Sequence, residues 1–288
     1  MEFSKSIIDL IKKRTSWRTY SLELLSEETR LELKQILKLT DTKSPIDSGK
    51  KNCRFELITI PEVEPDKRKQ LGTYGMISGA QEFIVGLSQK SEFYKTNFGY
   101  LFETIILKAT DLELGTCWLG GTFNRSNFSQ LAECQDEEVV PAITPIGYPK
   151  KRRAKEKIIR RMVGAKNRKA GEKLFFQNDF DTPLSFKDIG DYSTLLEMVR
   201  LAPSAGNRQP WRILKEDESE TYHFYVKYPE GKLASNYRAF VKIDIGIAIC
   251  HFDLTAKELS LSGNWIFDDP RVLISKEDLK YIITWKGT

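Results

Sequence analysis

Two long apolar segments repeat each other along the chain, one starting at Phe98 and the other at Gly246. They read FGYLFETIILKATDLELGTCWLGG and GIAICHFDLTAKELSLSGNW. At one offset of 147 residues six pairs are identical, namely Gly99 and Gly246, Leu107 and Leu254, Ala109 and Ala256, Leu112 and Leu259, Leu114 and Leu261, and Trp118 and Trp265. Self-similarity at a fixed spacing predicts an internal duplication in which each copy buries one long helix. The first helix is expected from about Tyr100 to Leu114, ended by Gly115.

The segments that precede these helices also divide the chain into two related halves. LKQILKLTDTKSP and TLLEMVRLAPSAG each end a Leu-rich helix in a polar loop that contains proline, and a strand-like run follows each. RFELITI (54–60) alternates as a strand does, and AQEFIVGLS (80–88) is apolar enough for a central strand. We therefore predict helices and strands mixed in a first half, residues 1–175, and a second half, residues 176–288, packed together as one unit.

Composition excludes several classes of protein. A net charge of +5 on 288 residues does not by itself predict nucleic-acid binding. The four cysteines are scattered, and two histidines are too few for a usual zinc site, so no metal is expected. The start of the chain lacks a secretory signal pattern, and no apolar stretch approaches the roughly 18 residues that a membrane helix needs. We expect a cytoplasmic protein with reduced thiols that binds neither a membrane nor nucleic acid.

The stretch RTSWRTY (14–20) places two arginines and a serine at alternate positions. In an extended segment such residues point to the same side, so Arg14, Ser16 and Arg18 would present two cations and a hydroxyl together. That combination is suited to an anion. A solvated basic turn after the first helix is the competing interpretation, and this stretch alone does not exclude it.

The stretch LAPSAGNRQPWRI (201–213) is predicted to be a loop between a helix and a strand. Pro203 and Pro210 interrupt helix, and Ser204, Asn207 and Gln209 offer hydrogen-bonding groups. Such a loop can approach a flat heterocycle closely. On physical grounds a plain turn is equally compatible with it.

Other reactive or charged residues have ordinary structural explanations. An isolated cysteine such as Cys117 or Cys134 is more often a small core residue than a redox group. His251 lies on the second apolar helix, where a hydrogen-bonded structural histidine is expected. The basic run KKRRAKEKIIRR (150–161) is expected to be a solvated face rather than a nucleic-acid or membrane-surface site.

Taken together, these stretches resemble the nitroreductase family of flavin enzymes. The matching motifs are R-x-S-x-R at 14–18, L-G-T-C-W-L-G-G at 114–121, P-I-G-Y-P at 145–149, K-x-R-K at 166–169 and A-P-S-A-G-N-x-Q-P-W at 202–211. An ordinary subunit of the family carries the first and last of these motifs together and works as a homodimer. Here they lie in different halves, so the chain is most similar to the internally duplicated TM nitroreductase branch, in which one chain imitates the dimer. The resemblance implies an α+β nitroreductase-like fold of two pseudo-symmetric halves, and a monomer.

The resemblance also implies an FMN site and assigns residues to it. Arg14 and Ser16 would bind the phosphate, as would Lys166 and Arg168, while Arg18 would stabilise negative charge at the N1 and O2 edge of the reduced flavin. The backbone of Gly120 and Gly121 would lie against N5. The isoalloxazine and ribityl chain would contact the loop that includes Pro203, Ser204, Ala205, Asn207 and Gln209. No side chain is expected to act as a catalytic nucleophile, since the cofactor carries the reaction.

The implied function is that of an FMN-dependent oxidoreductase. It would take hydride from NADH or NADPH and reduce a nitroaromatic, a quinone or a similar flat small molecule. Two alternatives stay open at this point. One is a flavin-binding carrier or redox sensor with little turnover, and the other is a nucleic-acid or surface-binding module that uses the basic run.

Overall fold

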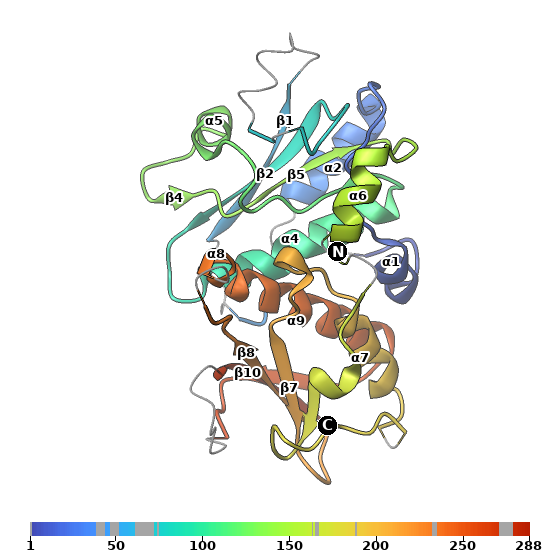
Figure 1. The fold of residues 1–288 in the computed structure, drawn as a ribbon, viewed down its shortest axis with the longest axis vertical. Coiled ribbons are helices and arrows are strands. Elements are labelled where there is room, and N and C mark those ends of the chain that lie inside the picture. The colour runs from blue at the N-terminus through green and yellow to red at the C-terminus, as the bar shows by residue number, and fades with distance from the viewer. Residues whose placement is uncertain are drawn as a thin grey trace. The chain divides into compact units, whose positions relative to one another are not determined.

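The computed structural model describes residues 2–38, 44–46, 52–60, 72–73, 75–162, 164, 167–187, 189–231, 235–270 and 279–288. They belong to two compact units (Figure 1). Unit 1 comprises Met1–Tyr94 and Leu101–Met162, and unit 2 comprises Lys95–Tyr100 and Val163–Thr288. The boundary predicted between residues 175 and 176 stays a prediction about the duplicated halves.

Unit 1 is built on a largely antiparallel sheet. Its elements are α1 (Ile7–Lys13), α2 (Glu27–Lys38), β1 (Cys53–Thr59), β2 (Glu82–Gln89), most of α4 (Tyr94–Asp111), β3 (Gly115–Thr116), α5 (Arg125–Leu131), β4 (Glu138–Val139), β5 (Ile143–Gly147) and α6 (Ala154–Met162). The strand order is β1-β2-β5-β3, with β4 also paired to β2. α2 packs on β1 (Figure 1). The two strands predicted here are confirmed as β1 and β2.

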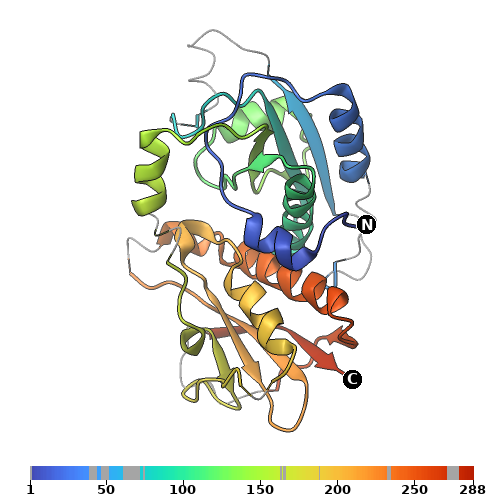
Figure 2. The same ribbon diagram turned by 90° about the vertical axis from the view of Figure 1, so that its right-hand side faces the viewer.

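Unit 2 has a second sheet, covered on one face by helices. Its elements are η1 (Gly171–Lys173), β6 (Phe175–Gln177), α7 (Tyr192–Arg200), η2 (Ala205–Asn207), β7 (Trp211–Lys215), β8 (Thr221–Lys227), α8 (Ser235–Arg238), α9 (Val241–Glu258), β9 (Gly263–Ile266) and β10 (Leu279–Gly287). The strand order is β6-β7-β8-β10-β9. α7 packs against α9, and α9 lies on β7 and β8 (Figure 2). Between α9 and the sheet, four aromatic rings pack against one another, namely Phe252 of α9 with Phe224, Trp265 and Trp285.

The two sheets follow the same path. In unit 1 the order β1-β2-β5-β3 uses antiparallel pairs throughout, and in unit 2 the order β7-β8-β10-β9 does the same. The last strand of each path, β3 in unit 1 and β9 in unit 2, directly follows the long helix of its unit in the chain. It comes before the strand that lies beside it in the sheet, which is β5 in unit 1 and β10 in unit 2. The predicted mixed fold of two related halves is confirmed.

The long helices α4 and α9 carry the repeat seen in the sequence. Each has 18 residues, and their first residues are 147 positions apart. A Cβ on Gly99 would lie 2.2 Å from the Ile243 carbonyl oxygen, and one on Gly246 would lie 2.0 Å from that of Thr96. Thr96 and Ile243 are also 147 positions apart. The contact is therefore reciprocal, as a duplicated helix pair requires.

The prediction for the first long helix was wrong at both ends. α4 begins at Tyr94 rather than Tyr100 and ends at Asp111 rather than Leu114. The helix stops before Gly115 because Glu113 takes a left-handed conformation (φ 62°), which leaves the glycine free to start β3. The predicted burial is confirmed, since α4 is buried from Thr96 to Asp111. None of the helices in the described part of the chain is long and apolar enough to span a membrane.

Candidate functional site

The RTSWRTY stretch takes the extended form in which Arg14, Ser16 and Arg18 would share one side. It runs beside the end of the unit 1 sheet, where Ser16 bridges Thr116 in parallel and the Trp17 amide donates to the Thr116 carbonyl at 2.8 Å. A Cβ on Gly115 would lie 3.1 Å from the Trp17 side chain, so the glycine lets the stretch lie close to β3. The backbone of β3 thereby fixes which way the alternate side chains of the stretch point.

Arg14, Ser16 and Arg18 converge on the Cys117 thiol, which follows β3. Burial raises the pKa of this thiol, while the Arg18 charge, a hydrogen bond with Ser16 and the Arg14 charge oppose that rise. Alternate side chains of an extended stretch point to the same side, which agrees with all three acting on this sulfur. Cys117 itself is a buried thiol with a raised pKa, which agrees with a packing role.

The helix α6 brings further charges to the same place. Arg160 donates to the Ser16 carbonyl at 3.1 Å, and burial together with repulsion from Arg152, Arg18 and Arg14 lowers its pKa. Glu156, one turn before it, accepts from the Thr19 hydroxyl at 2.8 Å and from Arg152 Nε at 3.1 Å. The Arg152 guanidinium also lies over the Trp17 ring at 3.9 Å.

The resulting arginine cluster of unit 1 consists of Arg14, Arg18, Arg152 and Arg160. Two buried carboxylates accompany it, Glu156 and Glu103, the second lying 3.7 Å from Arg14 Nε. Four cations and two anions leave a net charge of about +2. Among the described residues, the buried Nε atoms of Arg14 and Arg18 have no hydrogen-bond partner.

The expectation that the basic run is a solvated face was wrong for three of its members. Arg152, which precedes α6, and Glu156 and Arg160, which lie one turn apart on that helix, each contact the RTSWRTY stretch. Arg153 and Arg161, their neighbours, are exposed. The spacing of four was a readable signal, but nothing in the sequence indicated which side of the helix would be covered.

Gly120 and Gly121 lie in the loop between β3 and α5. The Gly120 carbonyl accepts from Arg125 at 2.9 Å, and Gly121 is exposed. Cys117 precedes Gly120 by three residues, so this loop continues directly from the arginine cluster. Its assignment to the flavin stays a prediction.

The unit 2 loop forms as predicted, and its geometry depends on left-handed residues. Gly206, Asn207 and Gln209 all have positive φ (59°, 55° and 47°), and the loop enters β7 at the buried Trp211. Gln209 is fully buried: its Oε1 accepts from the Lys169 amide at 2.8 Å and its Nε2 donates to the Arg200 carbonyl at 3.1 Å.

Hydrogen bonds of this loop are directed at the segment before η1. The Gln209 amide donates to the Ser204 hydroxyl at 2.9 Å, and Asn207 donates to the carbonyls of Gly164 and Asn167 at 2.7 and 2.8 Å. Arg168 donates to Asn207 Oδ1 and to the Leu201 carbonyl. The structure thus brings Ser204, Asn207, Gln209 and Arg168 together within unit 2. Pro203 and Ala205 are half-buried beside them, and Lys166 lies outside the described residues.

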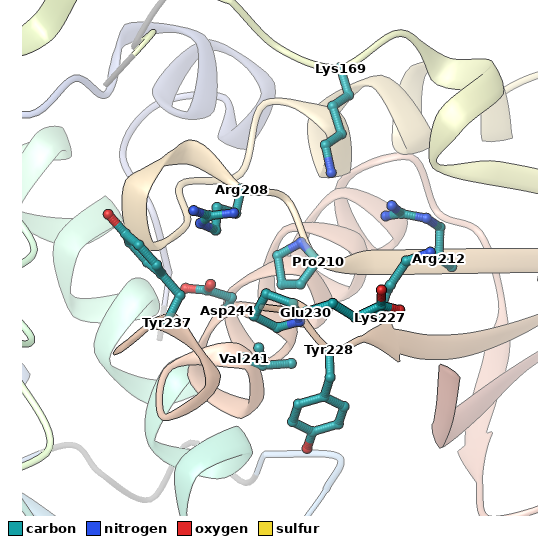
Figure 3. A pocket seen from close by; sticks show the side chains of 11 residues that line it. Lys169, Arg208, Pro210, Arg212, Lys227, Tyr228, Glu230, Tyr237, Val241 and Asp244 are labelled. Carbon is teal, nitrogen blue, oxygen red and sulfur yellow. The ribbon is translucent and has the colours of Figure 1, made fainter. Parts of the chain in front are cut away.

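A pocket of about 240 Å³ opens beside this loop (Figure 3). Its basic lining consists of Lys169, Arg208, Arg212 and Lys227, which sequence reasoning did not assign. The same pocket is lined by the buried Asp244, which accepts from the Ala205 amide at 3.0 Å. Burial raises the pKa of Asp244 to about 8, and that hydrogen bond opposes the rise. His251, on the same helix, bonds the Met198 carbonyl at 2.9 Å as a structural histidine would.

Comparison with known proteins gives a consistent result. A family model described as "Putative TM nitroreductase" matches residues 6–256. A "putative nitroreductase" from Thermotoga maritima MSB8 is similar over 99% of this chain and 95% of its own, at 18% identity and a TM-score of 0.59. An FMN-dependent nitroreductase from Clostridium difficile R20291 is similar over 51% of this chain and 89% of its own, at 19% identity and a TM-score of 0.41. No curated protein matches the chain.

Proposed function

The chain belongs to the TM nitroreductase family, a branch of the nitroreductase oxidoreductases, and we propose that it is an FMN-dependent oxidoreductase whose flavin phosphate is bound by the arginine cluster of unit 1. The observation that carries this proposal is the convergence of Arg14, Ser16 and Arg18 with Arg152 and Arg160. The acceptor is proposed to be a nitroaromatic, a quinone or a similar flat molecule, and the electron donor NADH or NADPH.

The charge and the donors of the cluster fit a phosphate monoester. Such a group carries close to two negative charges at neutral pH, and the cluster has a net charge of about +2. Arginine pairs well with phosphate because its N–H groups match the spacing of two oxygens. The buried Nε atoms of Arg14 and Arg18 have no hydrogen-bond partner in the described chain, and Arg14 Nε lies 3.7 Å from a Glu103 carboxylate oxygen, so neither donor is committed to another group by a hydrogen bond.

The length of the stretch allows its two arginines to serve different ends of one ligand. Four residues of extended chain separate Arg14 from Arg18 by about 13 Å. We assign Arg14, Ser16 and Arg160 to the phosphate, and Arg18 to the redox end. FMN, when bound, supplies the chemistry of accepting a hydride and passing the electrons on. The Arg18 guanidinium would then lie near the N1 and O2 edge and would stabilise negative charge there without moving a proton.

The other assignments are supported less directly. Gly120 and Gly121 are proposed for the N5 side because their loop follows the cluster and leaves the backbone accessible. Pro203, Ser204 and Ala205 remain proposed flavin contacts, as do Lys166 and Arg168 for the phosphate. The hydrogen bonds of Asn207 and Gln209 within unit 2 favour a role in shaping the loop, so a direct contact from their polar atoms would have to replace those bonds.

Further features of the proposal follow from the duplication. The reciprocal contact of Gly99 and Gly246 supports one chain imitating a dimer, and we propose a monomer with one flavin site. One accessible flavin face would serve donor and acceptor in turn and give parallel lines in steady-state plots. We keep the cytoplasmic assignment because the four cysteines form no disulfide.

The proposal is tested by the visible absorbance of the purified protein, loaded with FMN and mixed with NADPH or NADH without oxygen. We expect a flavin spectrum that bleaches. Arg160→Gln should bind FMN about tenfold more weakly, because it loses one charge-assisted contact. Arg161→Gln, the exposed neighbour on the same helix, should bind it as the wild type does.

Other outcomes have defined meanings. A bound flavin that stays oxidised with both nicotinamides would support the alternative of a carrier or redox sensor. A protein that cannot be loaded with FMN would overturn the proposal.

A further inference from the structure

Four cations from separate segments line one pocket of unit 2. Lys169 comes from the loop before η1, Arg208 follows η2, Arg212 lies on β7, and Lys227 ends β8. In the sheet Arg212 pairs with Tyr225, and Lys227 lies two residues beyond Tyr225, so the two cations project from the same face. Figure 3 shows the Lys169 ammonium reaching down between Arg208 and Arg212. We refer to Lys169, Arg208, Arg212 and Lys227 as the cation pocket.

Like charges held this close repel one another, and this repulsion contributes to a lowered pKa of Lys169. Burial, together with the charges of Arg212, Lys227, Arg208 and Lys173, lowers its pKa to about 8. The Lys169 ammonium donates only to a neutral acceptor, the Gln209 carbonyl at 3.2 Å, in the part of the chain that the structure describes. The Arg208 guanidinium lies over the Tyr237 ring at 4.2 Å, an interaction that holds the guanidinium without neutralising it.

The acidic residues that line the pocket do not balance these charges. Asp244, with its pKa raised to about 8, is mostly protonated at neutral pH, and Glu230 is exposed. The lining itself therefore holds four basic side chains and two acidic ones. Lys169, Arg212 and Lys227 are half-buried, and Arg208 is exposed. A cavity lined in this way is suited to an anion.

We infer that the cation pocket binds a phosphate monoester other than FMN, with the guanidinium groups of Arg208 and Arg212 pairing with the phosphate oxygens. The volume of about 240 Å³ sets the size of what is bound. It holds a phosphate and a small attached group, but it lies below the roughly 300 Å³ at which pockets for drug-sized ligands begin. The bound group is therefore a small phosphorylated metabolite or the phosphate end of a longer ligand, such as the 2′-phosphate of NADPH. This inference does not depend on the proposed function.

The test is calorimetric titration of inorganic phosphate into the full-length protein at low salt in a phosphate-free buffer at pH 7. Wild type should bind, and Arg212→Gln and Lys227→Gln should each bind at least about tenfold more weakly, because each loses one charge-assisted contact. Lys286→Gln, which removes an exposed charge of the same unit outside the pocket, should bind as wild type does. Thermal unfolding of each variant checks that it is folded.

A wild type that binds no phosphate would overturn the inference, as would equal weakening in Lys286→Gln. NADP⁺ and NAD⁺ are then titrated to separate the two sources. NADP⁺ binding tighter than NAD⁺, with the difference lost in Arg212→Gln, would identify the 2′-phosphate, whereas equal binding of both, with inorganic phosphate still bound, would indicate a small phosphorylated metabolite. If instead Arg212→Gln weakened FMN but not riboflavin, the pocket would hold the flavin phosphate and the inference would be wrong.

Discussion

Each of units 1 and 2 has the same strand path and a long buried helix, yet the two units differ in the carboxylates that accompany their basic residues. In each unit a tryptophan after the long helix donates to a carboxylate on that helix, Trp118 to Glu103 at 2.7 Å and Trp265 to Asp253 at 2.9 Å. The arginines of unit 1 are accompanied by the buried carboxylates Glu103 and Glu156. The cation pocket of unit 2 has only a mostly protonated aspartate and one exposed glutamate.

The difference arises partly from segments outside the shared sheet. Unit 1 adds the RTSWRTY stretch and α6, and unit 2 adds a loop of left-handed residues. Arg212 and Lys227, in contrast, lie on β7 and β8 of the shared strand path. The two units therefore share a strand path and a buried helix, and they differ in the surroundings of their basic residues. The predictions below test the shared part first and then the parts that differ.

The largest effect is expected at the shared helices. Gly246→Ala would place a Cβ 2.0 Å from the Thr96 carbonyl oxygen, and Gly99→Ala would place one 2.2 Å from that of Ile243. Because backbone has to move in both cases, each change should lower the free energy of unfolding by about 3 kcal/mol in urea denaturation. Gly171→Ala, whose nearest contact is 3.5 Å, is the control. A large cost at one glycine and none at the other would show that the two helices are not equivalent.

The second effect concerns the redox end proposed for unit 1. Arg18→Gln should slow reduction of bound flavin by NADPH or NADH about a hundredfold, because the negative charge of the reduced ring loses a fixed cation. Stopped-flow absorbance under anaerobic conditions measures the rate. Arg161→Gln, which removes an exposed arginine of α6, should leave that rate unchanged. Equal slowing in both variants would show that the effect does not depend on a cation fixed at the redox end.

The third effect is the pH dependence of phosphate binding in unit 2. Lys169 has a pKa of about 8, lowered by burial and by the facing charges of Arg212, Lys227, Arg208 and Lys173, so it loses its charge as the pH rises through 8. Asp244, beside the Ala205 amide, gains a negative charge over the same range. Glu230 also lines the pocket and is exposed. Phosphate affinity should therefore fall roughly tenfold between pH 7 and pH 9 in calorimetric titrations. Affinity that rises or stays constant over this range would contradict the assignment of these groups.

The smallest effect is expected from Asp244→Asn. The folded protein holds this aspartate protonated up to about pH 8, whereas the unfolded chain ionises it near 3.8, so its contribution to stability is lost as the pH rises between these values. Asparagine keeps an oxygen to accept from Ala205 and does not titrate. The variant should be more stable than wild type by about 1 kcal/mol at pH 7 and no more stable at pH 3. Destabilisation at pH 7 would mean that Asp244 is ionised and paired in the folded protein.

The sequence predicted much of the fold because apolar periodicity directly reports burial. The strands β1 and β2 and the burial of α4 follow from it. The ends of α4 were missed because a left-handed Glu113, rather than a glycine, stops the helix. A residue outside glycine with positive φ leaves no reliable trace in a single sequence.

The sites were less predictable, for a different physical reason. The grouping of Arg14, Ser16 and Arg18 is local and was predicted, but Arg152 and Arg160 join them only through the packing of α6. The cation pocket depends on β7 pairing with β8 and on the loop that carries Lys169, so its members are distant in sequence. A run of charged residues in a sequence indicates its net charge, whereas the tertiary structure determines which charged side chains lie close together.

The central claim, that the arginine cluster of unit 1 binds the flavin phosphate, is tested most directly by comparing FMN with riboflavin, which lacks the phosphate. The dissociation constants of both are measured for wild type, Arg160→Gln and Arg161→Gln. Wild type and Arg161→Gln should prefer FMN by at least about tenfold, and Arg160→Gln should lose most of that preference while binding riboflavin unchanged. A wild type that does not distinguish the two flavins, or an Arg160→Gln variant that weakens both equally, would contradict the account.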